Sequence, residues 1–461
     1  RTKSVWFKTN NDFKRVMIIG GGIAGALTIK ELNNNPQMKK RPVAIIDDDP
    51  SKYKKRLNGV PVCGGSDDIE RIARDKRIDE IIIAMPSAHR TVIKKIVGKC
   101  NNTGCRVKIL PGIYEIIDGK IDVKRIRDVE ISDLLGRSVV SMDLEEKDNY
   151  LKDGTILVTG GGGSIGSELC WQVARFSPRK IIILDNYENN AYEIHRRLTD
   201  KYESKPEIEV VIASIQDRTR IDKVFDQYRP TVVFHAAAHK HVPLMETSPG
   251  EAIKNNVLGT KNVADCAHKY GVDRFILIST DKAVNPTNVM GATKRIAEML
   301  IHSMDRISST KFAAVRFGNV LGSNGSVIPL FKKQIAAGGP VTVTHPDIVR
   351  FFMTIPEAVQ LVIHAGAMTR GGEIFVLDMG NPVKIADLAN DLIRLSGFEP
   401  GKDIEIKYIG LRPGEKLYEE LLLEDERLKG TTHPNIFYGQ PVPQDPVTLY
   451  KYIEQLEAIA D

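Results

Sequence analysis

The sequence predicts an α/β protein built from two doubly wound parallel sheets, the second followed by a smaller C-terminal lobe. Three observations support this prediction. Short apolar runs rich in β-branched residues alternate with helical segments, a glycine-rich turn follows the first run of each half, and 461 residues are about three times the usual length of one domain. Continuous apolar runs are typical of parallel strands that are covered on both faces.

The strands are expected in two groups. In the N-terminal part they are residues 16–19, 43–46, 80–84 and 107–110. In the second part they are residues 156–158, 180–184, 209–212, 232–234, 275–279 and 312–316, with helices between most of them. Past about residue 325, prolines, glycines and mixed helices replace the strands, and one helix is expected from Pro446.

These patterns predict the organisation of the chain. A charged segment that ends in Lys-Asp-Gly at residues 152–154 favours a connector between two folded parts. The predicted parts are an N-terminal domain at residues 1–125, a linker at 126–152, a second domain at 153–330, and a lobe with the C-terminal helix at 331–461 that belongs to the same unit as the second domain.

The composition excludes several classes of protein. Hydrophobic residues make up 42% and charged residues 27% of the chain, which excludes wholesale disorder. The net charge of +6 is too small and too dispersed for a nucleic-acid-binding surface. Five cysteines without a C-x-x-C pair exclude a disulfide framework and a closed zinc site, so no metal is expected and a reducing cytoplasm is favoured. No apolar stretch approaches the ~18 residues of a membrane span.

The second glycine-rich turn has the pattern of a nucleotide-binding site. Gly160 permits a tight turn, Gly163 lets the backbone approach a pyrophosphate, and Gly166 allows close packing of helix on strand. Asp185 ends the next strand, nineteen residues beyond Gly166. A carboxylate there accepts a ribose 2′-hydroxyl and repels a 2′-phosphate. The pattern therefore predicts a Rossmann-like domain that binds NAD rather than NADP.

The first glycine-rich turn, at residues 20–25, has matching geometry and is followed by an acidic run at residues 47–49. No catalytic motif comes after it, because the third strand leads only into Ala84, Met85 and Pro86. Two interpretations remain equal at this point. One is a vestigial or regulatory nucleotide site, and the other is a purely structural turn.

The strand at residues 275–279 leads into Thr280, Asp281 and Lys282, and a helix with Met290 and Lys294 follows. The carboxyl ends of parallel strands face the cofactor in a doubly wound fold, so a hydroxyl, an acid and a base are expected beside it. Composition alone also allows a different interpretation, in which Asp281 and Lys282 form an exposed turn.

Taken together, these motifs resemble the extended short-chain dehydrogenase/reductases, and more narrowly the UDP-N-acetylglucosamine 4,6-dehydratases of bacterial polysaccharide and glycan biosynthesis. The resemblance is carried by residues 159–166, 235–243, 255–260, 279–294, 316–322 and 411–416. It implies NAD as cofactor, UDP-N-acetylglucosamine as substrate and a homo-oligomer. Large members with an additional N-terminal domain are membrane-anchored, which implies an anchor before Arg1 and a location at the cytoplasmic face of the bacterial inner membrane.

The resemblance also implies which residues bind the ligands. The residues implied for the cofactor are Thr159, Gly160, Gly163, Ser164, Ile165, Gly166, Asp185, Ser214, Ile215, Ala236, Ala237, Ala238 and Lys294. Those implied for the substrate are His239, Lys240, Asn319, Ser326, Arg350, Arg412 and Glu415. Arginine can clamp the diphosphate, and a glutamate can bond a ribose hydroxyl. The histidines at 239 and 241 lack a nearby carboxylate pair, which favours a role in shaping the pocket over metal binding.

For catalysis, the resemblance implies oxidation at sugar C4, loss of the C6 hydroxyl and reduction at C6. Lys282, with a pKa lowered by burial and by Lys294, removes the C5 proton, and a protonated Asp281 donates to the departing hydroxyl. Thr280 holds the C4 oxygen and Lys294 the nicotinamide ribose. Met290 stands where most relatives have tyrosine. A methionine at this position is similar to the subgroup of large dehydratases that retains configuration at C5. Its thioether cannot relay the C4 hydroxyl proton, so the group that does so stays open.

Two other functions are weighed against the dehydratase. A UDP-hexose 4-epimerase of the same fold is disfavoured because epimerases depend on the tyrosine that Met290 replaces. A catalytically inactive NAD-sensing scaffold is suggested by the same replacement, and the presence of Asp281 and Lys282 disfavours it.

Overall fold

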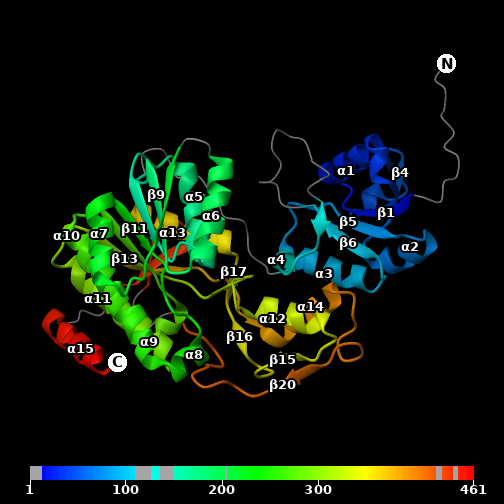
Figure 1. Ribbon diagram of the computed structural model, residues 1–461. Coiled ribbons are helices and arrows are strands. Elements are labelled where there is room, and N and C mark those ends of the chain that lie inside the picture. The colour runs from blue at the N-terminus through cyan, green and yellow to red at the C-terminus, as the bar shows by residue number, and fades with distance from the viewer. Residues whose placement is uncertain are drawn as a thin grey trace. The chain divides into compact units, whose positions relative to one another are not determined.

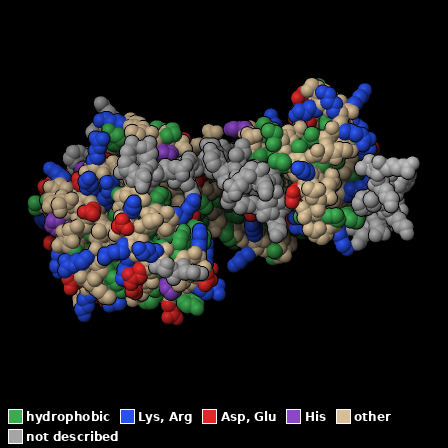
Figure 2. All heavy atoms as spheres, turned by 90° about the horizontal axis from the view of Figure 1, so that it is seen from above, with side chains coloured by type: hydrophobic (Ala, Val, Ile, Leu, Met, Phe, Trp, Pro, Cys, Tyr) green, Lys and Arg blue, Asp and Glu red, His purple; other side chains and the backbone are tan. Residues whose placement is uncertain are grey.

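The computed structural model describes residues 13–110, 126–134, 149–202, 205–421, 428–439 and 445–460. The chain divides into two compact units, one of residues 1–138 with 388–405 and one of residues 139–387 with 406–461. Each unit is built on a largely parallel sheet with helices, as the sequence predicts (Figure 1). Among the described residues, no helix is both long and apolar enough to span a membrane. Lys and Arg side chains are interspersed with Asp and Glu over the face drawn in Figure 2.

The sheet of the first unit has the strand order β3-β4-β2-β1-β5-β6-β7. Its strands are β1 (Lys14–Ile19), β2 (Lys40–Ile46), β3 (Arg56–Leu57), β4 (Val60–Gly64), β5 (Glu80–Ile83), β6 (Arg106–Ile109) and β7 (Arg127–Asp128). The four predicted strands are confirmed as β1, β2, β5 and β6, all parallel to one another. The sequence did not predict β4, because Pro61 interrupts its short apolar run.

The helices of the first unit pack against this sheet. They are α1 (Ile23–Asn34), α2 (Ile69–Asp75), α3 (Arg90–Asn101) and α4 (Ile131–Leu134), while α14 (Ile385–Leu395) includes residues of both units. In one apolar cluster, Ile29 and Leu32 of α1 meet Val16 and Ile18 of β1. Strand β7 and helix α4 lie within residues 126–152, so the beginning of the segment expected as a linker adds an antiparallel strand to the first sheet.

The sheet of the second unit has the strand order β10-β9-β8-β11-β12-β13-β18-β22-β21. Its strands are β8 (Thr155–Thr159), β9 (Lys180–Asp185), β10 (Glu207–Ile212), β11 (Val232–His235), β12 (Arg274–Ile278), β13 (Lys311–Arg316), β18 (Ile374–Leu377), β21 (Leu428–Gly430) and β22 (Ile436–Gly439). The first six are the six predicted strands. The last three were not predicted, and β22 and β21 extend the parallel sheet in antiparallel fashion.

Helices cover both faces of this sheet, which makes it doubly wound. They are α5 (Ser164–Val173), α6 (Glu188–Lys201), α7 (Arg218–Tyr228), α8 (Val242–Thr247), α9 (Pro249–Ala252), α10 (Thr260–Lys269), α11 (Val289–Asp305), α12 (Val327–Ala336), α13 (Ile355–Met368) and α15 (Pro446–Ile459). Ile156 and Val158 of β8 join one apolar cluster with α5, α6 and α13, while Leu157 between them joins a second cluster with α7, α10, α11 and α15. The predicted C-terminal helix is confirmed as α15.

Three small two-stranded sheets belong to the segment after β13. They are β14 (Asn319–Val320) with β17 (Phe352–Met353), β15 (Val341–Val343) with β20 (Ile406–Tyr408), and β16 (Val349–Arg350) with β19 (Val383–Lys384). These pairs and α12 form the smaller lobe. The lobe therefore carries Asn319 and Arg350, two residues implied for the substrate, on short paired strands.

A buried ion pair joins β13 to α11 beneath the end of β12. Arg316 and Glu298 are 0% and 1% exposed, and two guanidinium nitrogens of Arg316 donate to the two carboxylate oxygens at 2.7 Å each. The Ser279 hydroxyl donates to the same carboxylate at 2.6 Å. Burial opposes the charged form of Glu298, but Arg316 outweighs it and holds the pKa of that carboxyl below its usual range. The residue that precedes Thr280 is thereby fixed to the helix.

Glu298→Ala is expected to destabilise the protein by about 3–5 kcal/mol, because the Arg316 charge would remain buried without its partner. Urea unfolding measures the change. Since the pKa of Glu298 is lower in the folded state, its stabilisation is present above the pKa of the unfolded carboxyl and is lost as pH falls through the folded value. The control is Glu193→Ala on the exposed face of α6, expected to change stability by less than about 0.5 kcal/mol. A loss below about 1 kcal/mol for Glu298→Ala contradicts this account.

Candidate active site

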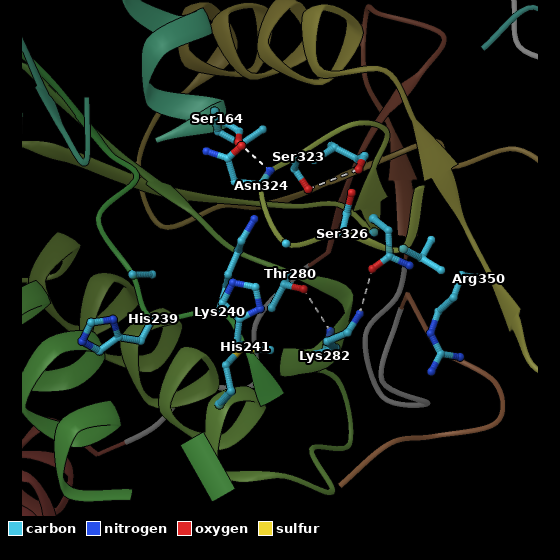
Figure 3. Close-up of a pocket in the computed structure, with 18 of the residues that line it drawn as sticks. Ser164, His239, Lys240, His241, Thr280, Lys282, Ser323, Asn324, Ser326 and Arg350 are labelled. Atoms are coloured by element: carbon cyan, nitrogen blue, oxygen red, sulfur yellow. Dashed lines mark hydrogen bonds between the residues drawn. The ribbon is translucent and has the colours of Figure 1, made fainter. Parts of the chain in front are cut away.

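A pocket of about 600 Å³ lies at the carboxyl ends of the strands of the second sheet. It is lined by the residues that follow β8, β11, β12 and β13, and from the other side by the smaller lobe. Figure 3 shows Ser164 of the glycine-rich turn, Lys240, Lys282 and Arg350 of the lobe around one hollow. Ligands of doubly wound proteins bind in this place, outside the carboxyl ends of the strands.

The glycine-rich turn after β8 can adopt its tight backbone only because its glycines lack side chains. Gly160 has a φ of +66°, which favours glycine, and a Cβ at Gly166 would lie 2.0 Å from the carbonyl oxygen of Gly160. Helix α5 begins at Ser164, and the N-cap residue Gly163 gives it no side-chain cap. The first amides of α5 therefore face the pocket as anion donors, and the cradle fits the pyrophosphate of a dinucleotide.

Asp185 lies at the end of β9 with its carboxylate fixed by backbone amides. One oxygen accepts from Gly162 N at 2.9 Å and the other from Tyr187 N at 2.9 Å. The carboxylate is therefore held beside the glycine-rich turn, where the sequence expects a ribose diol.

The structure brings most, though not all, of the implied cofactor residues into the pocket. Those that line it are Gly160, Gly163, Ser164, Ile165, Gly166, Ala236, Ala238 and Lys294. Thr159, Asp185, Ser214, Ile215 and Ala237 do not line it. Thr159 is fully buried and its hydroxyl contacts His235 Nδ1 at 2.7 Å, so it joins the ends of β8 and β11.

The first glycine-rich turn repeats these bonds. Gly21 N donates to Asp47 Oδ2 at 2.7 Å, and Asp49 N donates to the other oxygen at 2.9 Å. Helix α1 begins after Gly22 without a side-chain cap, and Ile23 is 83% exposed. In this unit Lys52 also pairs with Asp47 at 2.9 Å, so the carboxylate already has a cationic partner.

One buried asparagine positions the loop after β11. Asn256, 1% exposed, lies in a π-helical turn at Ile253–Gly259. Its side chain accepts from His239 N at 2.8 Å and donates to His239 O at 2.9 Å and to Thr293 Oγ1 at 3.1 Å. These bonds join the loop to α11 and place His239, Lys240 and His241 at the pocket wall. Asn256 belongs to the motif at residues 255–260, for which the sequence alone indicates no role.

The segment after β12 is compact and largely buried. Asp281 is 0% exposed, and one of its oxygens accepts from Thr280 Oγ1 at 2.8 Å and from Lys282 Nζ at 3.0 Å. Thr280 and Lys282 line the pocket, and Asp281 lies behind them. The interpretation of Asp281 and Lys282 as an exposed turn is therefore wrong. The other oxygen, Oδ2, is buried without a hydrogen-bond partner among the described residues.

The pKa of Lys282 shifts in the direction opposite to the one expected. Burial disfavours the ammonium, but the carboxylates of Asp281 and Glu419 stabilise it more strongly, so its pKa lies above the usual value. The lowered pKa belongs instead to Lys294 of α11, 5% exposed, where burial brings the value to about 8. Its ammonium donates to Ile278 O at 2.7 Å.

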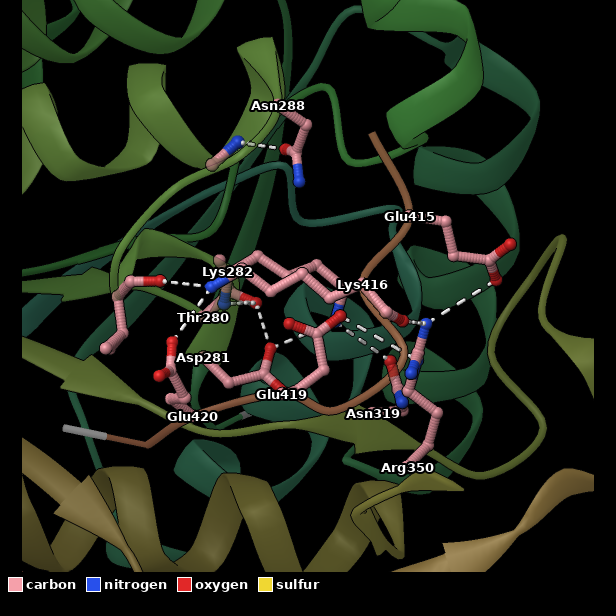
Figure 4. Close-up of polar contacts among 12 residues, drawn as sticks. Thr280, Asp281, Lys282, Asn288, Asn319, Arg350, Glu415, Lys416, Glu419 and Glu420 are labelled. Carbon is pink, nitrogen blue, oxygen red and sulfur yellow. Dashed lines mark hydrogen bonds and ion pairs between the residues drawn. The ribbon is translucent and has the colours of Figure 1, made fainter. Parts of the chain in front are cut away.

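Glu419 is a site residue that was not expected from the sequence. Its Oε1 lies 3.4 Å from Lys282 Nζ and 3.7 Å from Arg350 Nε, and its side chain is 4% exposed (Figure 4). Glu419 stands three residues beyond the motif at 411–416, outside any helix or strand, and no spacing rule could have indicated it. The burial of this carboxylate raises its pKa, although Lys282 and Arg350 act against the shift.

Met290 is a packing residue that also lines the pocket. It is 3% exposed and lies in a small apolar cluster with Met245, Ala252, Val242 and Val289. The position where relatives carry a tyrosine hydroxyl therefore presents an apolar surface to the pocket.

All seven residues implied for the substrate line the pocket. Arg350 already donates to the backbone oxygens of Val349, Lys416 and Leu417, and it lies 3.5 Å from Glu415. Ser326 is the N-cap residue of α12, but its side chain makes no capping hydrogen bond. Its buried hydroxyl has no hydrogen-bond partner among the described residues. Within those residues no group of three His, Cys, Asp or Glu is arranged to hold a metal ion.

Comparison with known proteins places this geometry in a family. Residues 156–441 match the family described as polysaccharide biosynthesis protein, and residues 2–111 match the one described as CoA-binding domain. The chain is 49% identical to the probable polysaccharide biosynthesis protein EpsC of Bacillus subtilis, over 97% of this chain and 75% of the relative.

Relatives with named reactions are more distant. The chain is 36% identical to a UDP-N-acetylglucosamine 4,6-dehydratase (inverting) of Campylobacter jejuni, over 59% of this chain and 78% of the relative. It is 37% identical to a UDP-glucose 4-epimerase of Rickettsia canadensis, over 60% and 80%. Among solved structures, Pen from Bacillus thuringiensis aligns with a TM-score of 0.58 at 34% identity, over 66% of this chain and 99% of Pen.

Gly166→Ala is expected to weaken NAD binding about tenfold or more, because the added methyl would meet the Gly160 carbonyl and force the turn open. Calorimetric titration with NAD measures the affinity. The control is Gly430→Ala in the same unit, where a Cβ meets nothing within 4 Å. Equal affinity of the two variants would show that this turn does not hold the cofactor.

Proposed function

The chain belongs to the polysaccharide biosynthesis protein family, and we propose that it is an NAD-dependent UDP-N-acetylglucosamine 4,6-dehydratase. The product is a UDP-2-acetamido-2,6-dideoxy-4-hexulose for the synthesis of a polysaccharide or glycan. One observation carries the proposal: Thr280 and Lys282 line a pocket that the glycine-rich turn also lines, and both are hydrogen-bonded to Asp281 behind them. The resemblance extends the proposal to a homo-oligomer anchored at the cytoplasmic face of the bacterial inner membrane.

The cofactor is held by residues whose geometry supports NAD. The amides at the start of α5 would receive the pyrophosphate, Asp185 would receive a ribose diol, and Lys294 of the pocket lining would hold the nicotinamide ribose. When bound, NAD supplies a hydride acceptor for sugar C4 and returns the hydride at C6, so no external oxidant is needed.

The hydrogen bonds of Asp281 suggest how the C4 hydroxyl loses its proton without a tyrosine. One oxygen of Asp281 accepts from both Thr280 and Lys282, so Asp281, taken as a carboxylate before the reaction, is placed to receive a proton through Thr280; the resemblance implies the protonated acid that follows from this transfer. The C4 proton can pass through the Thr280 hydroxyl to Asp281. The resulting carboxylic acid then returns the same proton through the Thr280 hydroxyl to the departing C6 hydroxyl, while Lys282 removes the proton from C5.

The substrate is held by the lobe. Arg350 and Arg412 supply cations for the diphosphate, Ser326 adds a hydroxyl at the start of α12, and Glu415 can accept from the uridine ribose. Retention of configuration at C5 is part of the proposal and depends on Met290.

Two other functions make different predictions. Identity does not separate dehydratase from epimerase, since relatives of the two kinds are 36% and 37% identical to this chain. The apolar surface of Met290 disfavours an epimerase, which needs a hydroxyl at that position. An NAD-binding scaffold does not require an acid and a base beside the pocket, so the presence of Asp281 and Lys282 disfavours this function.

Incubation with UDP-N-acetylglucosamine in deuterated water separates the three functions. We expect the sugar nucleotide to lose one water and to gain one deuterium at C5, as read by mass spectrometry and NMR, and the NMR couplings give the configuration at C5. Asp281→Asn should abolish this conversion, because an amide cannot take up and release the proton. A product of unchanged mass favours the epimerase, and unchanged substrate with bound NAD favours the scaffold.

Met290→Leu is expected to keep kcat within about threefold, because an apolar side chain of similar volume fills the same cluster. Thr280→Val, which removes the hydroxyl from the proton path, should lower kcat by about a hundredfold or more. Steady-state kinetics of the two variants gives the comparison. If Met290→Leu were as damaging as Thr280→Val, the thioether would have a part in the chemistry.

A further inference from the structure

We propose that Glu419 is a positioning residue that sets the charge state of Lys282 by taking up its ammonium proton, so that Lys282 acts as the base at sugar C5. This inference rests on the proposed dehydratase function and names the group that prepares its base.

The geometry places Glu419 behind Lys282. The Glu419 side chain is 4% exposed, and it does not line the pocket, so it acts through its neighbours. Its Oε1 lies 3.4 Å from Lys282 Nζ and 3.7 Å from Arg350 Nε, which puts one carboxylate between a catalytic cation and a cation of the substrate lobe (Figure 4).

A base has to be neutral, whereas Lys282 is held as an ammonium. Its Nζ lies 3.0 Å from Asp281 Oδ1, 3.4 Å from Asn319 Oδ1 and 3.4 Å from Glu419 Oε1. One proton must therefore leave this nitrogen before it can remove the proton from C5. Bulk water is a poor acceptor for it, because the Lys282 side chain is only 16% exposed.

Of the two neighbouring carboxylates, Glu419 is the one available to accept this proton. Asp281 is committed to the C4 and C6 proton through its bond to Thr280. Burial of Glu419 favours its protonated form, and its pKa lies above the usual value. Of the other charged groups of its loop, Lys416 pairs with Glu420 at 3.0 Å and Glu415 lies 3.5 Å from Arg350. Neither occupies the place between Lys282 and Glu419.

The transfer balances without another reactant. An N–H bond of Lys282 breaks and an O–H bond forms at Glu419 Oε1, so that an ammonium and a carboxylate become an amine and a carboxylic acid. The amine then removes the C5 proton and is an ammonium again. After reduction at C6 it returns a proton to C5, and Glu419 returns its proton to Lys282, which restores the starting state.

Substrate binding favours this transfer. When the diphosphate pairs with Arg350, the positive charge that stabilises the Glu419 carboxylate is shared with the substrate, and Glu419 holds a proton more readily. When Asp281 takes up the C4 proton, Lys282 loses the closer of its two anions. Both events occur before C5 deprotonation, so Lys282 becomes neutral only when the substrate is bound and its C4 hydroxyl has lost its proton.

The first test measures the pKa of Lys282 in the substrate-free protein, from the pH dependence of its acetylation by acetic anhydride, read by mass spectrometry of the Lys282 peptide. Glu419→Gln is expected to lower this pKa by about one pH unit or more, because it removes one of two anions near the ammonium. The matched control is Glu420→Gln, the neighbouring exposed glutamate that pairs with Lys416, which should leave the pKa unchanged. An unchanged pKa in Glu419→Gln overturns the proposal.

The second test measures kcat and KM for UDP-N-acetylglucosamine against pH. With Glu419 present the proton moves within the site, so kcat is expected to vary little with pH around neutrality. In Glu419→Gln only solvent can take the proton, so kcat should rise with pH up to the lowered pKa of Lys282, with KM within about threefold. Glu419→Asp, which keeps a carboxylate, should recover the original pH profile. A uniform loss of kcat at every pH, with the same profile as the unchanged protein, overturns the role as proton acceptor.

The two tests separate this inference from the proposed function. If the unchanged protein shows no turnover, the proposed dehydratase function is wrong, and so is the role of Lys282 as the base at C5. The acetylation experiment still decides whether Glu419 controls the charge of Lys282. A thermal unfolding curve for Glu419→Gln that matches the unchanged protein excludes a folding defect as the cause of either result.

Discussion

The buried carboxylate of Glu298 determines where the reactive groups of this protein lie. It is bonded by Arg316 of β13 and by Ser279 at the end of β12, and it belongs to α11, which also carries Lys294 one turn earlier. Lys294 in turn donates to Ile278 O, so α11 is attached to the end of β12 at two successive residues. Thr280, Asp281 and Lys282 follow directly, and their backbone is fixed by an ion pair that water does not reach. A buried pair of this kind costs free energy to desolvate, and it is retained here where strand end and helix have to meet at one position.

Two buried lysines of one pocket differ in pKa because different carboxylates face them. Glu298 lies one turn from Lys294 and acts to raise its pKa, but burial outweighs this effect and lowers the pKa of Lys294 to about 8. Lys282 has two carboxylates near it, and its pKa rises. Lys294 is thus a group that can lose its charge near neutral pH, while Lys282 keeps its proton until an acceptor is ready. The distribution of acids around the two amines, rather than their depth, decides which is charged.

The order of strands along the chain could be predicted because each central strand is a short apolar run, and the turn residues at 160–166 specify backbone geometry by themselves. The strands β18, β22 and β21 could not be predicted from the sequence, because their positions depend on pairing with β13 and with one another across long stretches of chain. The resemblance, through its motifs, implied the other pocket residues. Glu419 was missed because it lies on a loop of the lobe that returns to the strand end, which no local spacing encodes. The direction of the Lys282 pKa was missed because burial and Lys294 were considered, while the carboxylates of the adjacent Asp281 and of Glu419 outweigh them.

The two glycine-rich turns show that the turn alone does not make a catalytic site. Both have an acid that accepts from a turn amide, Asp47 from Gly21 and Asp185 from Gly162, at nearly the same distance. They differ in what the ends of other strands carry. In the first unit β5, which pairs with β1, leads into Ala84 and Met85, and the Met85 side chain lies against Gly20. In the second unit β12, which lies beyond β11 and does not pair with β8, leads into a hydroxyl, an acid and an amine, and residues of the lobe close the far wall of the pocket. A turn of this kind offers amides to an anion in either unit, whereas proton transfer requires titratable groups at the strand ends. We therefore assign the proposed chemistry to the second sheet, where the end of β12 carries an acid and an amine.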